Sequence, residues 1–443
     1  PEKLRLKTNH FVEPRLDSLR EKHHALLVKL GHHGAVLTLC AVVVLIAGGL
    51  AAASLGREYF PHVDAGQLRF QVRFPSGTRL EQTAARVTEI QREIRKIVPP
   101  AELQTVYEQI GVPDAVNLSL VDSAVVGSFE AEIMLQLKTP HGPSHEYLSR
   151  IRERIAEKFP DVKMFERPPD ATSRTLAGSA AAAFEVRIIG RDSAGNLALA
   201  REIEQNLHHV PGAVDVALRQ VLDLPEYQVH IDRTRAAQLG LDAQQASRAV
   251  LAVLGSAGTV SPVYWTDTVN ALAYTVQVQA PPVNMTNIDE LLNAPLRIGN
   301  DGQAVLLRNI ATVTPRQVPA SLARTTLAPT ISVLANVEGA DLGSVYDALT
   351  GITKQLEGRL KPGNRIEIVG QAGEMQSAYG ELAGGLLMSA ALVFLVLVVN
   401  FQSWIQPLVA MSGLPLAIAG AAFGLFVPGT PLSVPALMGV VMV

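Results

Sequence analysis

The chain closes with a run, residues 382–443, that contains no Asp, Glu, Lys, Arg or His. A second charge-free apolar run occupies residues 35–55, and a long stretch of ordinary soluble composition separates the two. A charge at the centre of a bilayer costs about 2.5–3.5 kcal/mol on insertion scales, whereas a soluble core of this length would carry scattered charges. The pattern therefore predicts a membrane protein with a large water-facing insert between its spans.

These runs predict three transmembrane helices and the start of a fourth. Residues 34–56 exceed the roughly 20 residues that cross a hydrocarbon core of about 30 Å, and residues 374–400 and 407–428 form two more spans. Residues 432–443 match the beginning of a further span, so we expect the chain to be a fragment of a longer protein. A cleaved signal peptide is the alternative for the first span, but the apolar stretch is longer than the usual length of about 7–15 residues.

Two features inside the third span predict its local structure. Pro415 is expected to kink the helix, because proline cannot donate the backbone hydrogen bond of a helix interior. Gly420 and Gly424 form a GxxxG pattern, which predicts close packing against a neighbouring helix.

The basic residues before the first span indicate its orientation. We interpret residues 1–33, which are rich in Lys and Arg, as a cytoplasmic juxtamembrane segment, so that the insert lies on the opposite side of the membrane. The net charge of −3 gives no sign of the basic surface that nucleic-acid binding requires. The single cysteine, Cys40, lies in a predicted span, which leaves the insert without cysteine.

Within the insert the hydrophobic period alternates between that of a strand and that of a helix. Residues 67–74 predict a strand, 80–98 an amphipathic helix, and 103–110 and 130–137 two more strands. A second helix at 147–159 and a short strand at 162–165 complete the order βαββαβ. This order predicts a ferredoxin-like domain over residues 57–175, with both helices on one face of a four-stranded sheet.

A second ferredoxin-like unit is predicted in two pieces, residues 184–222 and 318–373. Each piece reads as strand, helix and strand, and neither half has enough apolar surface to stand alone. We therefore expect the two halves to share one sheet, with residues 223–317 inserted between them. The predicted fold class is an α+β membrane protein.

Three local sequences carry a family resemblance: GREYFPHVDAGQLRFQVRFPSGT at 56–78, YQVHIDRTRAAQLGL at 227–241 and VNFQSWIQPLVAMSGLPLAIAG at 399–420. In this order, and with the plan of span, insert and closely spaced spans, the chain resembles the second half of a resistance-nodulation-division (RND) transporter. The resemblance covers essentially the whole chain, from before the seventh span into the tenth, and is closest to the hydrophobe/amphiphile efflux branch. It implies that the two ferredoxin-like units are porter subdomains and that residues 223–317 are a docking-domain portion.

The resemblance also implies a function. It implies a multi-pass inner-membrane permease with a large periplasmic domain, which exports amphiphilic small molecules at the expense of the proton gradient. It further implies a homotrimer in the lipid bilayer that works with a periplasmic adaptor and an outer-membrane channel. The family's proton-coupling residues lie in the fourth and tenth spans, so no proton relay is expected within this chain.

Two alternatives stay open. One is another RND class, either metal efflux or a protein-export subunit; methionine or acidic pairs along the path would favour metals, and none is apparent in the sequence. The other is a membrane-anchored periplasmic scaffold or adaptor that moves no substrate. A second copy of the same plan with buried carboxylates, in a longer chain, would exclude the scaffold.

The sequence shows no catalytic constellation, no cofactor motif and no metal-ligand spacing, which predicts a secondary active transporter rather than an enzyme. By resemblance, the linker at residues 111–127 corresponds to the switch loop beside the family's drug pocket. Aliphatic residues of this linker and apolar residues near it give the substrate-path candidates Leu118, Leu120, Val125, Phe129, Met164 and Phe165. The alternative is that Phe129 and Phe165 are ordinary core residues.

Overall fold

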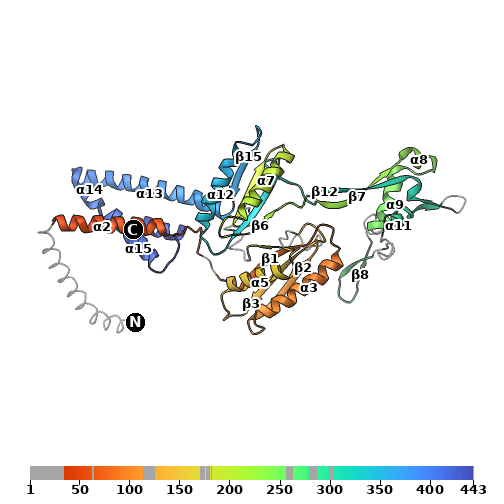
Figure 1. The fold of residues 1–443 in the computed structure, drawn as a ribbon, viewed down its shortest axis with the longest axis horizontal. Coiled ribbons are helices and arrows are strands. Elements are labelled where there is room, and N and C mark those ends of the chain that lie inside the picture. Colours follow the sequence, from red (N-terminus) through yellow and green to blue (C-terminus); the bar gives the residue numbers. More distant parts are fainter. Residues whose placement is uncertain are drawn as a thin grey trace. The chain divides into compact units, whose positions relative to one another are not determined.

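The computed structural model describes residues 34–61, 64–112, 125–169, 175, 180, 182–255, 263–276, 278, 287–298 and 303–442. The chain divides into two compact units, residues 1–220 with 322–443, and residues 221–321. The first unit holds two β-sheets with their helices and the apolar helices, and the second unit is an insertion between two strands of one sheet (Figure 1).

The first sheet forms from the residues that follow the first apolar helix. Its elements are β1 (Gln67–Arg73), α3 (Leu80–Ile97), β2 (Leu103–Ile110), β3 (Glu130–Leu137), α5 (Ser144–Lys158) and β4 (Lys163–Glu166). The strands pair antiparallel in the spatial order β2-β3-β1-β4. The elements follow the order βαββαβ that the hydrophobic periodicity predicted.

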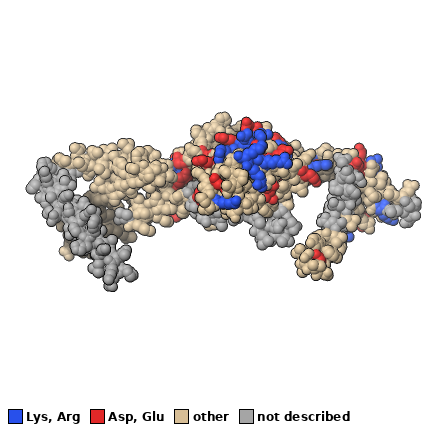
Figure 2. Space-filling view, turned by 90° about the horizontal axis from the view of Figure 1, so that it is seen from below, with Lys and Arg blue, Asp and Glu red and all other residues tan. Residues whose placement is uncertain are grey.

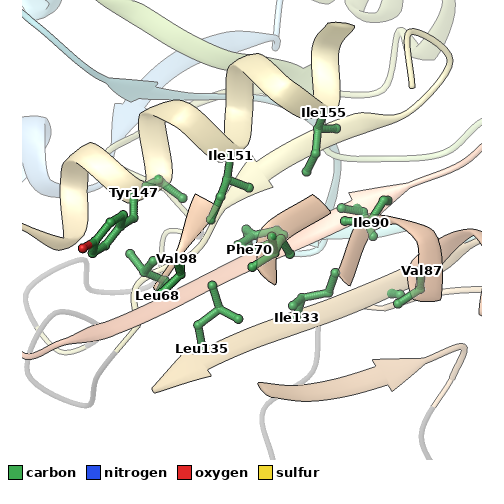
Figure 3. Close-up of a cluster of buried hydrophobic side chains, with 14 of the residues drawn as sticks. Leu68, Phe70, Val87, Ile90, Val98, Ile133, Leu135, Tyr147, Ile151 and Ile155 are labelled. Carbon is green, nitrogen blue, oxygen red and sulfur yellow. The ribbon is translucent and has the colours of Figure 1, made fainter. Parts of the chain in front are cut away.

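One face of this sheet is covered by both helices. Successive residues of a strand point to opposite faces, so alternate residues of β1 and β3 meet the helices. Along each helix, apolar residues three or four positions apart form one stripe. Figure 3 shows the resulting core, which includes Leu68, Phe70, Val87, Ile90, Ile133, Leu135, Ile151 and Ile155. The prediction that the two helices cover the same face is confirmed.

The opposite face of the first sheet carries buried charge. The side chains of Arg69 and Glu132 are 3% and 1% exposed, and Arg69 Nε lies 2.6 Å from Glu132 Oε1. Four residues further along β1, Arg73 Nε lies 2.6 Å from Glu130 Oε1. Strand alternation therefore places an apolar row and a row of ion pairs on the two faces of one strand.

The second sheet combines two segments that are far apart in sequence. They are β5 (Phe184–Ile189), α7 (Ser193–Leu207) and β6 (Ala213–Leu218), and then β13 (Ala323–Thr325), β14 (Ala328–Val337), α12 (Leu342–Glu357) and β15 (Arg365–Val369). β14 pairs with β5, β6 and β13, and β15 pairs with β5. Residues of α7 and α12 share one core with those of the strands. The prediction that the two segments form one sheet is confirmed.

Within the described residues, three helical stretches are long and apolar enough to cross a membrane: α2 (Gly34–Ser54), α13 (Gln371–Phe401) and the stretch Ile405–Phe426. The last is interrupted, since α14 (Ile405–Met411) and α15 (Gly413–Phe426) are separate helices. Pro415 lacks the amide hydrogen that would bond the carbonyl of Met411, which explains the interruption. A short helix, α16 (Val434–Met442), follows. Figure 2 shows charged side chains gathered over the sheets, whereas the described surface at the left, which belongs to the apolar helices, is almost free of them.

The helices α2 and α15 pack through small residues. Gly48 lies so close to Ala419 that an added Cβ would stand 2.4 Å from the Ala419 Cβ. At Gly420 and Gly424 an added Cβ would meet no described atom within 4 Å. The close contact therefore uses a neighbouring face of α15 rather than the GxxxG face that we expected, because successive helix positions are rotated by about 100°.

The insertion, residues 221–321, has a hydrophobic core of its own. β7 (Leu224–Ile231) pairs antiparallel with β12 (Ala311–Val318) along their whole lengths. Between them lie α8 (Arg233–Gln238), α9 (Ala243–Gly255), the hairpin of β8 (Val263–Thr266) and β9 (Ala273–Val276), α11 (Ile288–Leu292), β10 (Pro295–Ile298), β11 (Ala304–Leu306) and η2 (Leu307–Asn309). Leu241, Ile310, Leu291 and Leu307 are buried between these elements.

Candidate functional site

The substrate-path candidates of the linker lie at or beyond the edge of what the structure describes. Leu118 and Leu120 fall outside the described residues. Val125 and Phe129 are 6% and 1% exposed. The Phe129 carbonyl accepts a hydrogen bond from the Phe74 amide at 2.9 Å, which ties the end of the linker to the first sheet. A role of these residues in a substrate path stays a prediction.

The other two candidates lie on β4. Met164 is partly buried and packs against the core of the first sheet. Phe165 is 8% exposed and packs against Ala182 and against Leu334 of β14. Phe165 therefore takes part in the contact between the two sheets, and its role in a substrate path also stays a prediction.

A cavity of about 780 Å³ borders this contact. Its walls come from α5, from the residues after β4, from the end of β14, and from the loop between α15 and α16. The charged and titratable residues that line it are Glu58, His145, Arg152, Glu166, Arg167 and Glu338. None of the four described substrate-path candidates lines it. Because ligand sites favour cavities where separate substructures meet, this cavity is the candidate functional site.

One arginine joins three carboxylates beside the cavity. Arg152 of α5 donates from Nε to Asp215 Oδ1 at 2.7 Å and from Nη2 to Asp215 Oδ2 at 3.1 Å. The same guanidinium lies 3.4 Å from Glu166 Oε2 and forms an ion pair with Glu338. Bidentate pairing fixes the planar guanidinium in one orientation. Arg152 thus links α5 and β4 of the first sheet to β6 and the end of β14 in the second.

Asp215 has an unusual backbone conformation that suits this role. Its φ of 54° lies in the left-handed region, which residues other than glycine adopt infrequently. It belongs to β6, which lies beside β4, each strand at the edge of its own sheet. Asp215 Oδ2 accepts the backbone amide of Glu166 at 2.9 Å and the side-chain amide of Asn336 at 3.1 Å. The carboxylate therefore satisfies an edge amide of β4, and the two sheets do not merge into one.

The cluster holds more negative than positive charge. The side chain of Asp215 is 2% exposed, whereas those of Glu166 and Glu338 are 32% and 35% exposed. Burial, together with the nearby carboxylates of Asp215 and Glu338, raises the pKa of Glu166 to about 7, although Arg152 opposes the rise. Glu166 therefore gains and loses a proton near neutral pH, at which an ordinary glutamate is fully ionised.

The far end of the cavity borders a junction with the apolar helices. The Tyr379 hydroxyl of α13 lies 3.0 Å from the Glu58 carbonyl oxygen and 2.7 Å from that of Leu432. The Glu58 amide donates to the Leu432 carbonyl at 2.8 Å, and the Arg57 amide donates to Asp341 Oδ2 at 2.9 Å before α12. The segment after α2 is thereby tied to α13, to α12 and to the loop between α15 and α16.

Sequence reasoning missed the charged cluster. Arg152 and Glu338 are 186 residues apart, and Arg152, Glu166 and Glu338 resemble the many other charged residues of the chain. The sequence showed no acidic pair along a path, and the structure places Glu166 and Glu338 at the wall of one cavity. Asp215 gives a local signal, since it interrupts the apolar strand AVDVAL.

The cluster does not form a metal centre. Among the described residues, no group of three or more His, Cys, Asp and Glu side chains is arranged to hold a metal ion. The Asp215 carboxylate is engaged by Arg152, by Asn336 and by the Glu166 amide. The described residues of the cavity therefore offer no preformed coordination sphere for a cation.

Comparison with known proteins identifies relatives along the whole chain. The model of the AcrB/AcrD/AcrF family matches residues 3–443. The cation efflux system protein CzcA of Alcaligenes sp. (strain CT14) and the cobalt-zinc-cadmium resistance protein CzcA of Cupriavidus metallidurans are each 26% identical over 426 residues, which is 95% of this chain and 39% of each relative. The nickel and cobalt resistance protein CnrA of Cupriavidus metallidurans is 26% identical over 95% of this chain and 38% of its own length. The chain thus spans about two fifths of the length of these relatives.

The fold is shared with a solved structure. The crystal structure of a heavy metal efflux pump, in its crystal form II, matches 92% of this chain and 41% of its own with a TM-score of 0.77 and 24% identity. These relatives carry the names of metal transporters, so they favour the metal-efflux alternative over the hydrophobe/amphiphile branch that the sequence motifs predicted. Because the family model covers the chain from residue 3 to its last residue, the chain belongs to the AcrB/AcrD/AcrF family of RND transporters.

Proposed function

We propose that this chain is part of an inner-membrane RND transporter that exports divalent metal cations. The observation that carries the proposal is similarity along 95% of the chain to proteins named for resistance to cobalt, zinc, cadmium or nickel. The carboxylates of Glu58, Glu166 and Glu338 at the cavity support it as oxygen groups that attract cations, and Arg152 and Arg167 balance part of their charge. Export of amphiphilic molecules is less well supported.

In this proposal the insert is periplasmic and the three apolar stretches are membrane spans. Residues 57–175, and residues 184–222 with 318–373, are two ferredoxin-like porter subdomains, which the strand order β2-β3-β1-β4 and the matching order β6-β14-β5-β15 support. Residues 223–317 are a docking-domain portion. The complete protein works as a homotrimer with a periplasmic adaptor and an outer-membrane channel, and is driven by the proton gradient. Family membership supports these last features.

The cavity passes cations without coordinating them tightly. A transport site has to bind its ion well enough to load and weakly enough to release. The described residues offer carboxylates at the wall of a space of about 780 Å³, which accommodates a hydrated cation, and offer no preformed group of three ligands.

The proposal is tested by resistance measurements with the complete transporter in a bacterial host that lacks its own metal exporters. The inhibitory concentrations of Co²⁺, Ni²⁺, Zn²⁺ and Cd²⁺ are expected to rise several-fold, while those of an amphiphilic dye and a detergent stay unchanged. The double substitution Glu166→Gln and Glu338→Gln should reduce the gain. Glu153→Gln, at an exposed position of α5, is the control and should not reduce the gain. A rise for the dye without a rise for the metals would support the amphiphile branch instead.

A further inference from the structure

Besides the apolar contact of Phe165 with Leu334, the two sheets touch through two sets of polar contacts, at opposite ends of β6. At its C-terminal end, Arg73 of β1 donates from Nη1 to the Leu218 carbonyl and from Nη2 to the Arg219 carbonyl, both at 3.0 Å. Near its N-terminal end, Asp215 meets Arg152. The first contact joins a permanent cation to neutral carbonyls and has no group that titrates near neutral pH. The second includes carboxylates, whose charge depends on pH.

We propose that Arg152, Asp215, Glu166 and Glu338 form a proton-operated latch, which holds the two sheets together beside the cavity while Glu166 is protonated and releases them when Glu166 ionises. The existence of the latch depends only on the two sheets, whereas its role as a gate to the cavity rests on the proposed function. The latch adds to that function a means of control by pH.

The charges of the cluster explain why one proton matters. A single guanidinium faces Asp215, Glu338 and Glu166. While Glu166 is neutral, the positive charge of Arg152 faces two negative charges, those of Asp215 and Glu338, and Arg152 forms ion pairs with both. With Glu166 ionised, a third negative charge lies beside Asp215, whose side chain is only 2% exposed, and repulsion in this poorly hydrated place works against the contact.

The direction of the pH effect follows from the raised pKa of Glu166, about 7, caused first by burial and then by Asp215. Separation of the sheets exposes Glu166 to water and removes it from Asp215, so its pKa falls toward the ordinary value of 4.5. Protons therefore bind more tightly to the closed arrangement. The closed arrangement is fully favoured below the lower pKa, and this advantage is lost as the pH rises through about 7.

Several charged groups face Glu166 or share its cavity. Arg152 comes from α5, Asp215 from β6 and Glu338 from the segment after β14. Arg167 follows Glu166 in the chain, and His145 of α5 and Glu58 line the same cavity. A neutral substitution at Glu166 alone therefore separates its contribution from that of the other titratable groups.

The architecture lets the sheets part without unfolding. β4 and β6 are edge strands of different sheets, so their separation breaks no strand ladder. The Glu166 amide, which donates to Asp215 at 2.9 Å, would donate to water instead. Because the Arg73 contact does not titrate, it acts as the pivot about which the Asp215 end opens.

The latch is tested by measuring the separation of the two sheets as a function of pH. Spin labels are placed at Ala156→Cys on α5 and Ala198→Cys on α7, both exposed positions, in a background with the single native cysteine removed by Cys40→Ser. Double electron–electron resonance on the full chain in lipid nanodiscs then gives the distance distribution from pH 5.5 to 8.5. We expect one short distance at low pH and a longer population that grows with a midpoint near pH 7.

Three variants complete the test. Glu166→Gln should keep the short distance up to pH 8.5, and Arg152→Met should show the longer population at every pH. Arg86→Met removes the exposed ion pair with Asp161, in which no residue of the second sheet takes part. The label-to-label distance in this variant should change with pH as it does in the unsubstituted chain. An unchanging distance from pH 5.5 to 8.5 in the unsubstituted chain, or a pH response that persists in Glu166→Gln, would overturn the latch. A pH-dependent distance without metal resistance would confirm the latch and reject the proposed function.

Discussion

Removal of one partner of the buried ion pair between Arg69 and Glu132 should destabilise the first sheet far more than removal of both. The two side chains are 3% and 1% exposed, and their charged atoms lie 2.6 Å apart. Arg69→Met leaves the Glu132 carboxylate buried without its cation, a change that costs about 3–5 kcal/mol in comparable cases. Adding Glu132→Leu removes the second charge and fills its place with apolar atoms. We expect the double variant to lie within about 1 kcal/mol of the original stability, or above it.

Hydrogen exchange of the full chain, read by mass spectrometry of peptides, measures this effect where it arises. Peptides that cover β1 and β3 report the free energy at which the sheet opens. Since about 1.4 kcal/mol corresponds to a tenfold change in an equilibrium constant, Arg69→Met should accelerate exchange in these peptides by about 10²–10⁴-fold. In the double variant, exchange in the same peptides should slow again to nearly the rate of the unsubstituted chain.

The exposed pair between Arg86 and Asp161 supplies the matched control. Their side chains are 29% and 44% exposed, and pairs of this kind contribute about 0–1 kcal/mol. Arg86→Met should therefore accelerate exchange much less than Arg69→Met does, even though it also removes the guanidinium that lies over the rings of Phe74 and Phe159. If Arg69→Met proved as mild as Arg86→Met, or if the double variant were no more stable than Arg69→Met, burial of an unpaired charge would not be the cause.

Three further predictions concern other parts of the chain. Gly48→Ala should weaken the packing of α2 on α15 by about 1–3 kcal/mol, because its Cβ would stand 2.4 Å from that of Ala419. Thermal unfolding in detergent measures this, and Gly49→Ala, whose Cβ meets no described atom within 4 Å, should melt unchanged; equal effects of the two would contradict the prediction. Leu327→Gly should raise stability by about 1 kcal/mol, since Leu327 has a φ of 67° and is 93% exposed, and a lower melting temperature would show that its side chain makes a stabilising contact. Raising the pH from 6 to 8 should lower the protection of β4 amides after correction for intrinsic exchange, because the pKa of Glu166 is raised to about 7; constant protection would contradict this.

Local patterns predicted most of the helices and strands, because the hydrophobic periodicity that indicates each of them lies within its own residues. The stripe of Val87, Ile90 and Ile94 predicted α3 before any partner was known, and all three are buried. The boundaries moved by a few residues where the pattern was weak, as for the short last strand, predicted at 162–165 and found as β4 at Lys163–Glu166. The GxxxG pattern predicted close packing of this span but not which helix it meets, and the structure brings α2 to Ala419, because the sequence of one helix does not reveal where its neighbour lies.

The charged cluster was beyond the reach of sequence reasoning for a related reason. Arg152, Glu166, Asp215 and Glu338 come from α5, β4, β6 and the segment after β14. Nothing local distinguishes Arg152 from the other arginines of α5, and the pKa of Glu166 depends on burial and on Asp215, which is distant in sequence. The motifs likewise predicted the transporter family but favoured the amphiphile branch, whereas comparison over the whole chain favours metal efflux.

The sequence alone determined which stretches are apolar and long enough to cross a bilayer, because the cost of burying charge in a bilayer leaves such stretches without it. It also determined the alternation of strands and helices, because hydrophobic periodicity reflects the geometry of each element. Only the tertiary structure decided how two sheets meet at their edges. That meeting brings one arginine and three carboxylates together beside a cavity, and it gives a glutamate of ordinary sequence context a pKa near neutrality.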